Sequence, residues 1–515
     1  MASTGLGIAA SAINAATTEI AVTSENIANA QTPGYAVQRA QLAPQPGAGI
    51  LGIGDGVSVT SVAQVTNALL SANNLQAQGS LQSLTASQQL LTGIQDIFPL
   101  GQSSAAAASS STGSSNSSIA GQLANFWSSF DAIAQDPSGM ASRTQVVDQA
   151  QGLAQSLNEA STQLTQLATN TVSQLQGQVS QANQLIQQAA TLNGQIAATA
   201  GGGGSPNQLI DQLNQVVNQL GQLAGVSVHS QADGEATINI AGIAVVQGDQ
   251  ATTLSLQAST GTTTSAQQAS TGIPAGTVYT SAGVVAAGSG GVAVPMTGGS
   301  IGGLLSGLGP DGAIAAYQGQ LNTVAVNLAT AVNQQLAQGY TAPGVSPPAS
   351  YTGTVPPAYP ATGWDAGLQG SALPLFLATG GGTPTAATIT VSSDLLGNPA
   401  LIAAASSASN GAGAGANDGS NAQAIAELAN ATSNSPDVAY QTLIENIGSA
   451  TQAVNNQVTS QTSVANQAQQ ALQSVTGVNQ NTELTNLMQY QAAYQASAKL
   501  VTVIDTTIQS LLQAV

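Results

Sequence analysis

Apolar side chains recur every three or four residues at both ends of the chain, and this spacing predicts a helix at each end. The face near the start is formed by Leu6, Ala9, Ile13, Ala16, Ile20, Thr23 and Ile27. The face near the end is formed by Leu484, Leu487, Gln491, Tyr494, Ala498, Val501, Asp505, Ile508 and Leu512. A lone helix cannot bury such a stripe, so we expect the two terminal helices to pack against each other.

The first helix should end before Pro33, because proline lacks a backbone donor and disfavours helical backbone at the residue before it. The same helical spacing continues over residues 146–196, and at 1.5 Å per residue it predicts a rod of about 75 Å. Gly152, Gly177 and Gly194 leave it open whether the rod is unbroken. Four glycines at 201–204 end it, and Ser205 and Pro206 are predicted as the N-cap and first position of a helix over 207–223.

The period changes to two after Gly225 and predicts strands at 226–228 and 236–240, joined by a turn at Asp233 and Gly234. Further short strands are expected at 253–256, 277–280, 291–296 and 387–391, and helical spacing returns at 313–336. Residues 406–419 are rich in Gly, Ala, Ser and Asn, and we interpret them as a loop before helices that run from Ala422 to the end.

These elements predict a mainly α fold with β-rich insertions, an α+β multidomain protein whose chain runs out through its domains and back. The expected parts are an inner coiled-coil domain (1–35 plus 479–515), a long-helix bundle (36–225, 311–340 and 398–478), a β-rich inserted domain (226–310) and a small insertion rich in Pro, Gly and Thr (341–397). Phe126, Trp127 and Phe130 stand at helical spacing and are expected in the core of the bundle.

The composition excludes several classes of function. Only 5% of the 515 residues are charged. The chain has three cationic residues, Arg39, Arg143 and Lys499, and 21 acidic residues, which gives a net charge of −18. Nucleic acids and anionic membranes would repel such a chain, so neither partner is expected. We find no apolar run long enough for a membrane span and no signal peptide at the start, and expect no membrane insertion.

The residue types present do not favour a catalytic site. The chain has no cysteine and a single histidine, His229, which cannot alone form a zinc site or a triad. Residues 417–421 resemble a calcium loop only faintly, because Ala429 stands where a glutamate ligand would be; a turn and a helix cap at Ser420 or Asn421 fit better. We therefore expect no enzyme activity, no cofactor and no metal.

Four segments carry a family resemblance. Residues 26–35, from Asn26 to Tyr35, resemble the N-terminal signature of flagellar rod, hook and hook-associated proteins. Residues 205–212, residues 298–305 with Val332 and Asn333, and residues 477–499 resemble blocks of the hook-associated members, in the same order. The chain departs from the family at 213–214 and 480–482, where relatives carry more charge, so salt bridges made there in relatives are not expected here.

The resemblance implies a structural subunit of the bacterial flagellum, located at the junction between hook and filament and required for filament assembly. It further implies a ring of identical subunits, contacts with the hook protein and the next junction or filament proteins, and an export chaperone. Export would use the flagellar type III apparatus without a cleaved signal peptide, and the final location would be extracellular. A distal rod or hook protein, or a secreted coiled-coil adhesin, is the alternative.

We expect the subunit interface to lie on the terminal helices, because their stripes need partners. The tyrosines among these residues could equally pack within one subunit, since a buried ring with a wet hydroxyl suits either position. The predicted interface residues are Leu6, Ile13, Ile20, Ile27, Tyr35, Leu484, Leu487, Tyr490, Tyr494, Val501, Ile508 and Leu512.

Overall fold

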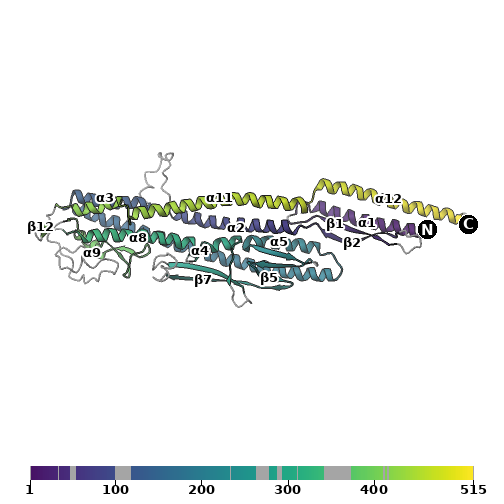
Figure 1. Ribbon diagram of the computed structural model, residues 1–515, viewed down its shortest axis with the longest axis horizontal. Helices are drawn as coiled ribbons and strands as arrows, with labels where there is room; N and C mark the ends of the chain where they lie inside the picture. Colours follow the sequence, from purple (N-terminus) through teal and green to yellow (C-terminus); the bar gives the residue numbers. More distant parts are fainter. Residues whose placement is uncertain are drawn as a thin grey trace.

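The molecule is elongated, and its two termini lie at the same end (Figure 1). The chain leaves that end in α1 (Ala2–Ala28) and returns to it through α11 (Pro436–Thr476) and α12 (Gln480–Gln513). The computed structural model describes residues 2–32, 34–46, 54–98, 118–231, 234–262, 278–286, 293–309, 311–341, 373–406, 408–409, 412–413 and 417–513. The predicted fold class, mainly helical with small antiparallel sheets and paired terminal helices, is confirmed.

Long helices form the body of the molecule. Around α4 (Met140–Gly201) lie α2 (Ala68–Ile97), α3 (Ile119–Gln135), α5 (Asn207–Ala224) and α8 (Ala313–Ala337), and α11 packs on α2 and α8. Shorter helices are α7 (Gly299–Leu305), α9 (Ser393–Gly397), η1 (Pro399–Leu401), α10 (Ser420–Ala426) and η2 (Glu427–Asn430). The apolar faces of these helices share one continuous core.

The predicted rod is present as α4, a helix of 62 residues and therefore about 93 Å long. Its buried face repeats at steps of three and four, through residues such as Leu157, Leu164 and Ile186. A side-chain carbon built at Gly152 or Gly177 would meet no neighbouring atom. These glycines lie where nothing packs against the helix, so they do not interrupt it.

Aromatic rings fill the core at the end of the body far from the termini. Phe126 and Phe130 of α3 are fully buried and meet edge to face, with their ring centroids 5.3 Å apart. Trp127 is 4% exposed, and its indole Nε1 donates to Asp437 Oδ2 on α11 at 2.9 Å. The prediction that these three residues form core is confirmed.

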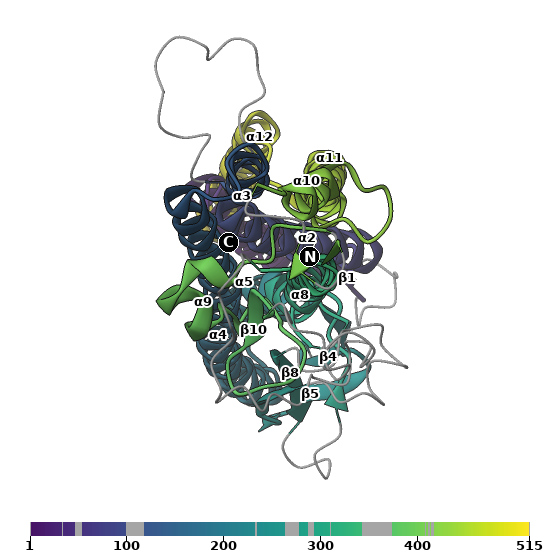
Figure 2. The ribbon, with the colours of Figure 1, turned by 90° about the vertical axis from the view of Figure 1, so that its left-hand side faces the viewer.

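Small antiparallel sheets lie along one side of the helices (Figures 1 and 2). One sheet has the order β3-β4-β5-β6 and a second has β7-β8-β9; β10 pairs with β11, and β12 with β13. Their bounds are β3 (Val226–Ser230), β4 (Ala236–Ile240), β5 (Ile243–Gln247), β6 (Gln250–Ala251), β7 (Leu254–Thr262), β8 (Val278–Ala286), β9 (Ala293–Val294), β10 (Phe376–Ala378), β11 (Ile389–Val391), β12 (Ala408–Ser409) and β13 (Ala412–Gly413). Every predicted strand is present, although Asp233 of the predicted turn lies outside the described residues.

Buried asparagines fasten these sheets to the helices. Asn193 of α4 is fully buried; its Nδ2 donates to the carbonyls of Ala236 and Gly248, and its Oδ1 accepts the Ala236 N–H at 3.0 Å. Asn183 binds both backbone groups of Leu254 in the same way, and Asn333 of α8 binds Phe376. An amide carries both a donor and an acceptor, so it satisfies a strand edge without burying a charge.

Glycines allow α7 to approach both α2 and α5 closely. A side-chain carbon at Gly303 would lie 2.1 Å from the carbonyl oxygen of Ser83, and one at Gly299 would lie 2.4 Å from the backbone of Leu223. Gly299 also has a φ of +70°, a conformation that favours glycine. The glycine-rich block at 298–305 therefore has a packing role.

Three local predictions need correction. Pro206, not Ser205, occupies the N-cap of α5, and the first helical residue is Asn207. The segment interpreted as a loop contains the short strands β12 and β13. The cap before α10 is Gly419, with Asp418 Oδ1 accepting the Ser420 N–H at 3.0 Å. The proposed division into four domains stays a prediction.

Candidate functional site

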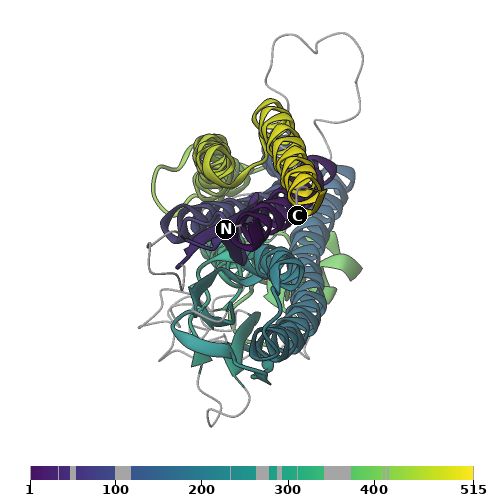
Figure 3. The ribbon, with the colours of Figure 1, turned by 90° about the vertical axis from the view of Figure 1, so that its right-hand side faces the viewer.

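The terminal layer, which we define as α1, α12 and the hairpin of β1 (Gln38–Gln45) and β2 (Gly56–Gln64), forms one end of the molecule (Figures 1 and 3). Both α12 and the hairpin pack on α1, which lies between them. The two helices are antiparallel: Gly5 lies beside Ile504, and Asn26 beside Glu483. The sequence did not predict this hairpin.

On α1, small residues are buried and the larger predicted ones are not. Ala9, Ala16 and Thr23 of the predicted stripe are at most 3% exposed. Ile13, Ile20 and Ile27 are only half-buried, and Leu6 is 43% exposed. A single subunit therefore leaves the largest side chains of the stripe incompletely covered.

On α12, the predicted residues differ in how far they are buried. Leu487, Tyr490, Val501 and Ile508 are half-buried, at the helical spacing of Ile504, which contacts α1. Other large side chains are exposed: Leu484 by 48%, Tyr494 by 41%, and outside the predicted set Met488, Leu500 and Val503 by 45% to 63%. The side chain of Leu512 is outside the described part of the chain.

Tyr35 has a place within its own subunit. Its hydroxyl donates to Asn26 Oδ1 at 2.9 Å, and burial raises the pKa of this phenol, reinforced by the charges of Glu25, Asp211 and Glu483. The contact favours the interpretation in which Tyr35 packs inside one chain.

A polar junction lies where the terminal layer meets the body. The guanidinium of Arg39 forms two bonds to the fully buried carboxylate of Glu483, at 2.6 and 2.9 Å. Asn26 Nδ2 donates to Glu483 Oε2 and to the Gln38 carbonyl, and Asn26 Oδ1 accepts the Gln38 N–H. A two-pronged ion pair is stronger and more directional than a single contact, so this junction fixes α12 against α1 and β1.

The same network continues into α5. Asn207 Nδ2 donates to Gln38 Oε1 at 3.0 Å and to the Val62 carbonyl at 2.9 Å. Gln64 Nε2 in turn donates to Asp211 Oδ1 at 2.9 Å. Side chains of α5 thus hold both strands of the hairpin, and these bonds attach the terminal layer to the body through neutral amides and the carboxylate of Asp211.

The junction brings together three of the segments that carry the family resemblance. Asn26 and Tyr35 come from the first, Asn207 and Asp211 from the second, and Glu483 from the last. Sequence reasoning singled out these segments but not their meeting point, and it missed the roles of Gln38, Arg39 and Gln64. Their spacing carries no signal, because the contacts join residues up to 457 positions apart.

Asp211 should make the junction more stable in mild acid. Burial, with the charge of Glu25, raises the pKa of this carboxyl from 3.8 to about 6, although the Ala36 N–H and Gln64 bonds oppose the shift. The folded state then holds more protons than the unfolded state between about pH 4 and pH 6, so stability falls as pH rises through this window. We expect the urea midpoint of the protein to decrease from pH 4.5 to pH 7, and Asp211→Asn to weaken that decrease. An unchanged pH dependence in Asp211→Asn, with exposed Asp249→Asn as control, would contradict this assignment.

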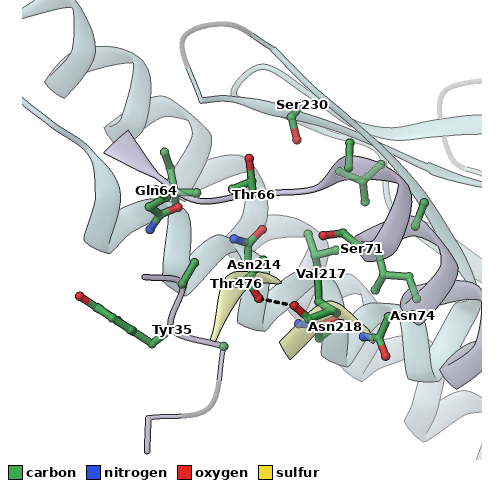
Figure 4. A pocket seen from close by; sticks show the side chains of 18 of the residues that line it. Tyr35, Gln64, Thr66, Ser71, Asn74, Asn214, Val217, Asn218, Ser230 and Thr476 are labelled. Carbon is green, nitrogen blue, oxygen red and sulfur yellow. Dashed lines mark hydrogen bonds between the residues drawn. The ribbon is translucent and has the colours of Figure 1, made fainter. Parts of the chain in front are cut away.

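A groove of about 1920 Å³ opens beside the junction, bordered by Tyr35, Gln64 and Thr66 on one side and by Asn214 and Asn218 of α5 on another (Figure 4). Its labelled side chains are mostly neutral and polar. His229 also lines it, from an exposed position on β3, as expected for a surface residue. Within the described residues no group of three or more His, Cys, Asp or Glu side chains could hold a metal ion.

One helix, α1 over Gly5–Ala28, is long and apolar enough to cross a membrane by length and composition alone. The same properties occur in the core helices of soluble proteins and in signal sequences. Here α1 packs between α12 and the hairpin.

Comparisons with known proteins place these features in one family. The family model described as "Flagellar hook-associated protein FlgK helical domain" matches residues 107–347. Those for "Flagella basal body rod protein" and "Flagellar basal body rod FlgEFG protein C-terminal" match residues 6–35 and 468–514, which are the terminal helices. Flagellar hook-associated protein 1 of Salmonella typhimurium is 25% identical, with 98% of each chain aligned.

The chain belongs to the flagellar hook-associated protein 1 family. The Escherichia coli K12 relative is 29% identical over 49% of this chain and 44% of its own length. The solved flagellar hook junction protein FlgK from Burkholderia pseudomallei shares the fold, with a TM-score of 0.55 and 21% identity over 79% of this chain and all of that one. This family consists of structural rather than enzymatic proteins, and the chain is an extracellular hook–filament junction component of the flagellum. A match to the hook-associated helical domain also favours this assignment over a rod or hook protein.

Proposed function

We propose that the terminal layer is the surface through which copies of this chain assemble into a ring between the hook and the filament. The observation that carries the proposal is the incomplete burial of Leu484, Met488, Leu500 and Val503 in a single subunit. Exposed apolar surface of this extent is removed from water when subunits meet. Eleven of the twelve predicted interface residues belong to this layer and are proposed to contribute to contacts between subunits; Tyr35, between α1 and β1, is the exception.

The remaining partners follow from the place of the family in the flagellum. We propose that the hook protein lies on one side of the ring and the next junction or filament protein on the other. A flagellar export chaperone would cover the terminal helices before assembly, because their apolar faces lack a partner until then. The terminal helices of the ring would surround the axial channel, with the body facing outward.

Order in the terminal layer is proposed to be completed by assembly. Fixing α1 and α12 costs conformational entropy, which the contacts within one subunit offset only in part because so many large side chains stay exposed. Neighbouring subunits would supply the missing contacts.

Polar substitutions on α12 test the proposal. We expect Leu484→Gln, Met488→Gln and Val503→Thr together to abolish assembly, since they remove apolar area that only another subunit would cover. Thermal unfolding of the body should change little, because these side chains are 48% to 63% exposed. Electron microscopy should show hooks without filaments, with filament protein shed into the medium.

The matched control lies on α11. Val464 and Val475 are 48% and 41% exposed and stand outside the terminal layer, so Val464→Thr with Val475→Thr should leave the filaments normal. Filaments of normal number and length in the α12 variant would overturn the proposal.

A further inference from the structure

Two of the three cations of the chain are bonded within the subunit, and the third has no bonded partner among the residues that the structure describes. Arg39 is paired with Glu483. Arg143 donates to the carbonyls of Pro137, Ala400 and Ile402. Lys499 is exposed on α12, and its ammonium has no hydrogen bond or ion pair within the described part of the chain. A charge without an internal partner in so weakly charged a chain is available to another molecule.

An acidic counterpart lies at the same level of the terminal layer but on another element. Asp55 is exposed just before β2, and its carboxylate is likewise unpaired among the described residues. Ser11 of α1 fixes the position of the hairpin along the axis of α1, because its Oγ accepts the Val57 N–H at 3.2 Å. The Gly5–Ile504 and Asn26–Glu483 contacts of the antiparallel helices place Lys499 next to residues 10 and 11 of α1. Lys499 and Asp55 therefore lie at the same position along the axis of α1.

These two charges belong to elements that cover α1 from different directions. In Figure 1 α12 lies above α1 and the hairpin lies below it. Apolar side chains accompany both charges. Leu500 and Val503 are exposed near Lys499, and Leu42 of β1 is 44% exposed on the hairpin.

From these positions, and resting on the proposed self-assembly, we propose that α12 of one copy packs on the hairpin β1–β2 of the next copy, with Lys499 paired to Asp55. The two surfaces are unlike and complementary in charge. A contact between unlike surfaces repeats from copy to copy and produces rings or helical arrays, whereas a two-fold contact of α12 with itself would close at a dimer. Charge pairs at interfaces mainly determine register and partner choice, so this pair sets the alignment of neighbouring subunits.

Cysteine cross-linking in isolated flagella tests the contact directly, because the chain has no cysteine of its own. A strain that makes both Asp55→Cys and Lys499→Cys chains should yield cross-linked dimers under mild oxidation, and each variant alone should yield none. The double variant should yield a ladder of multimers. Ser510→Cys, exposed further along α12, is the matched control and should not cross-link to Asp55→Cys.

Charge exchange provides a second test that does not depend on the cysteine variants assembling. Lys499→Glu and Asp55→Lys should each lower the fraction of cells with filaments about fivefold or more, and the double exchange should restore it, because only the double exchange rebuilds an opposite-charge pair. Normal filaments in the cysteine strains without any cross-link would overturn this contact. So would a double charge exchange with no more filaments than the single exchanges. Neither result would contradict self-assembly itself. Loss of assembly in the α12 apolar variants is a separate result and tests only the proposed function.

Discussion

Replacing Arg143 by alanine is expected to lower the free energy of unfolding of the helical body by about 3 kcal/mol, since buried carbonyls that lose their donors cost roughly 1–3 kcal/mol each. Arg143 is 3% exposed and has no carboxylate partner among the described residues; its bonds go to carbonyls, at 2.8 Å to Pro137 and 2.6 Å to Ile402. It stands in the first turn of α4, where the helix dipole disfavours a cation. Its contribution must therefore come from these bonds.

Two further variants separate the possible causes. Arg143→Lys keeps the charge but lacks the planar fork that reaches separated carbonyls, so it should lose most of the same stability. Thr144→Ala changes the exposed neighbouring residue and should have little effect. Urea unfolding followed by circular dichroism measures all three, and a lysine variant as stable as the natural protein would show that charge alone matters.

Replacing Arg39 by alanine is expected to destabilise the terminal layer by about 2 kcal/mol, because truncating one partner of a buried, hydrogen-bonded pair leaves the other charge unpaired. The remaining carboxylate, Glu483, has a side chain only 1% exposed, while the Arg39 side chain is 38% exposed. Hydrogen exchange of β1, β2 and the start of α12 should report the loss. The body should be unaffected, because its core lies elsewhere.

A double-mutant cycle makes this prediction specific. Glu483→Gln removes the charge but keeps an amide that can accept from Asn26, so Arg39→Ala with Glu483→Gln should cost less than the sum of the two single changes. Gln41→Ala, at an exposed position of the same strand, should be close to neutral. Strictly additive effects would mean that the ion pair does not hold the layer.

Elements with a long, regular period could be predicted from the sequence. The spacing of residues 146–196 predicts α4, and Gly152 and Gly177 do not interrupt it because nothing packs against the helix at those positions. The terminal helices and their pairing were also predicted correctly. The strands around β3 and β4 followed from a period of two and a turn glycine.

The hairpin β1–β2 was not predicted because β1 lacks a clear alternation of apolar and polar residues: it contains Pro44 and several glutamines, and a bulge interrupts its register between Gln41 and Leu42. The polar junction escaped for a different reason. Its bonds join amides and charged groups from α1, β1, β2, α5 and α12, and only the folded chain brings these elements together.

The stripe predicted on α1 illustrates the limit of pattern reasoning. The periodicity predicted the buried face of α1 correctly. It did not predict that small residues such as Ala9 and Ala16 are buried while Leu6 is exposed. Depth of burial depends on how closely α12 and the hairpin approach, and that distance is set by three-dimensional packing.

Hydrogen exchange, compared between the soluble monomer and isolated flagella, tests most directly the claim that this layer joins subunits. Amides of residues 5–28 and 484–512 should exchange quickly in the monomer, while those of α4 are protected, and should become strongly protected in flagella. Protection of the two terminal segments in the monomer equal to that of α4, with no gain on assembly, would contradict the account.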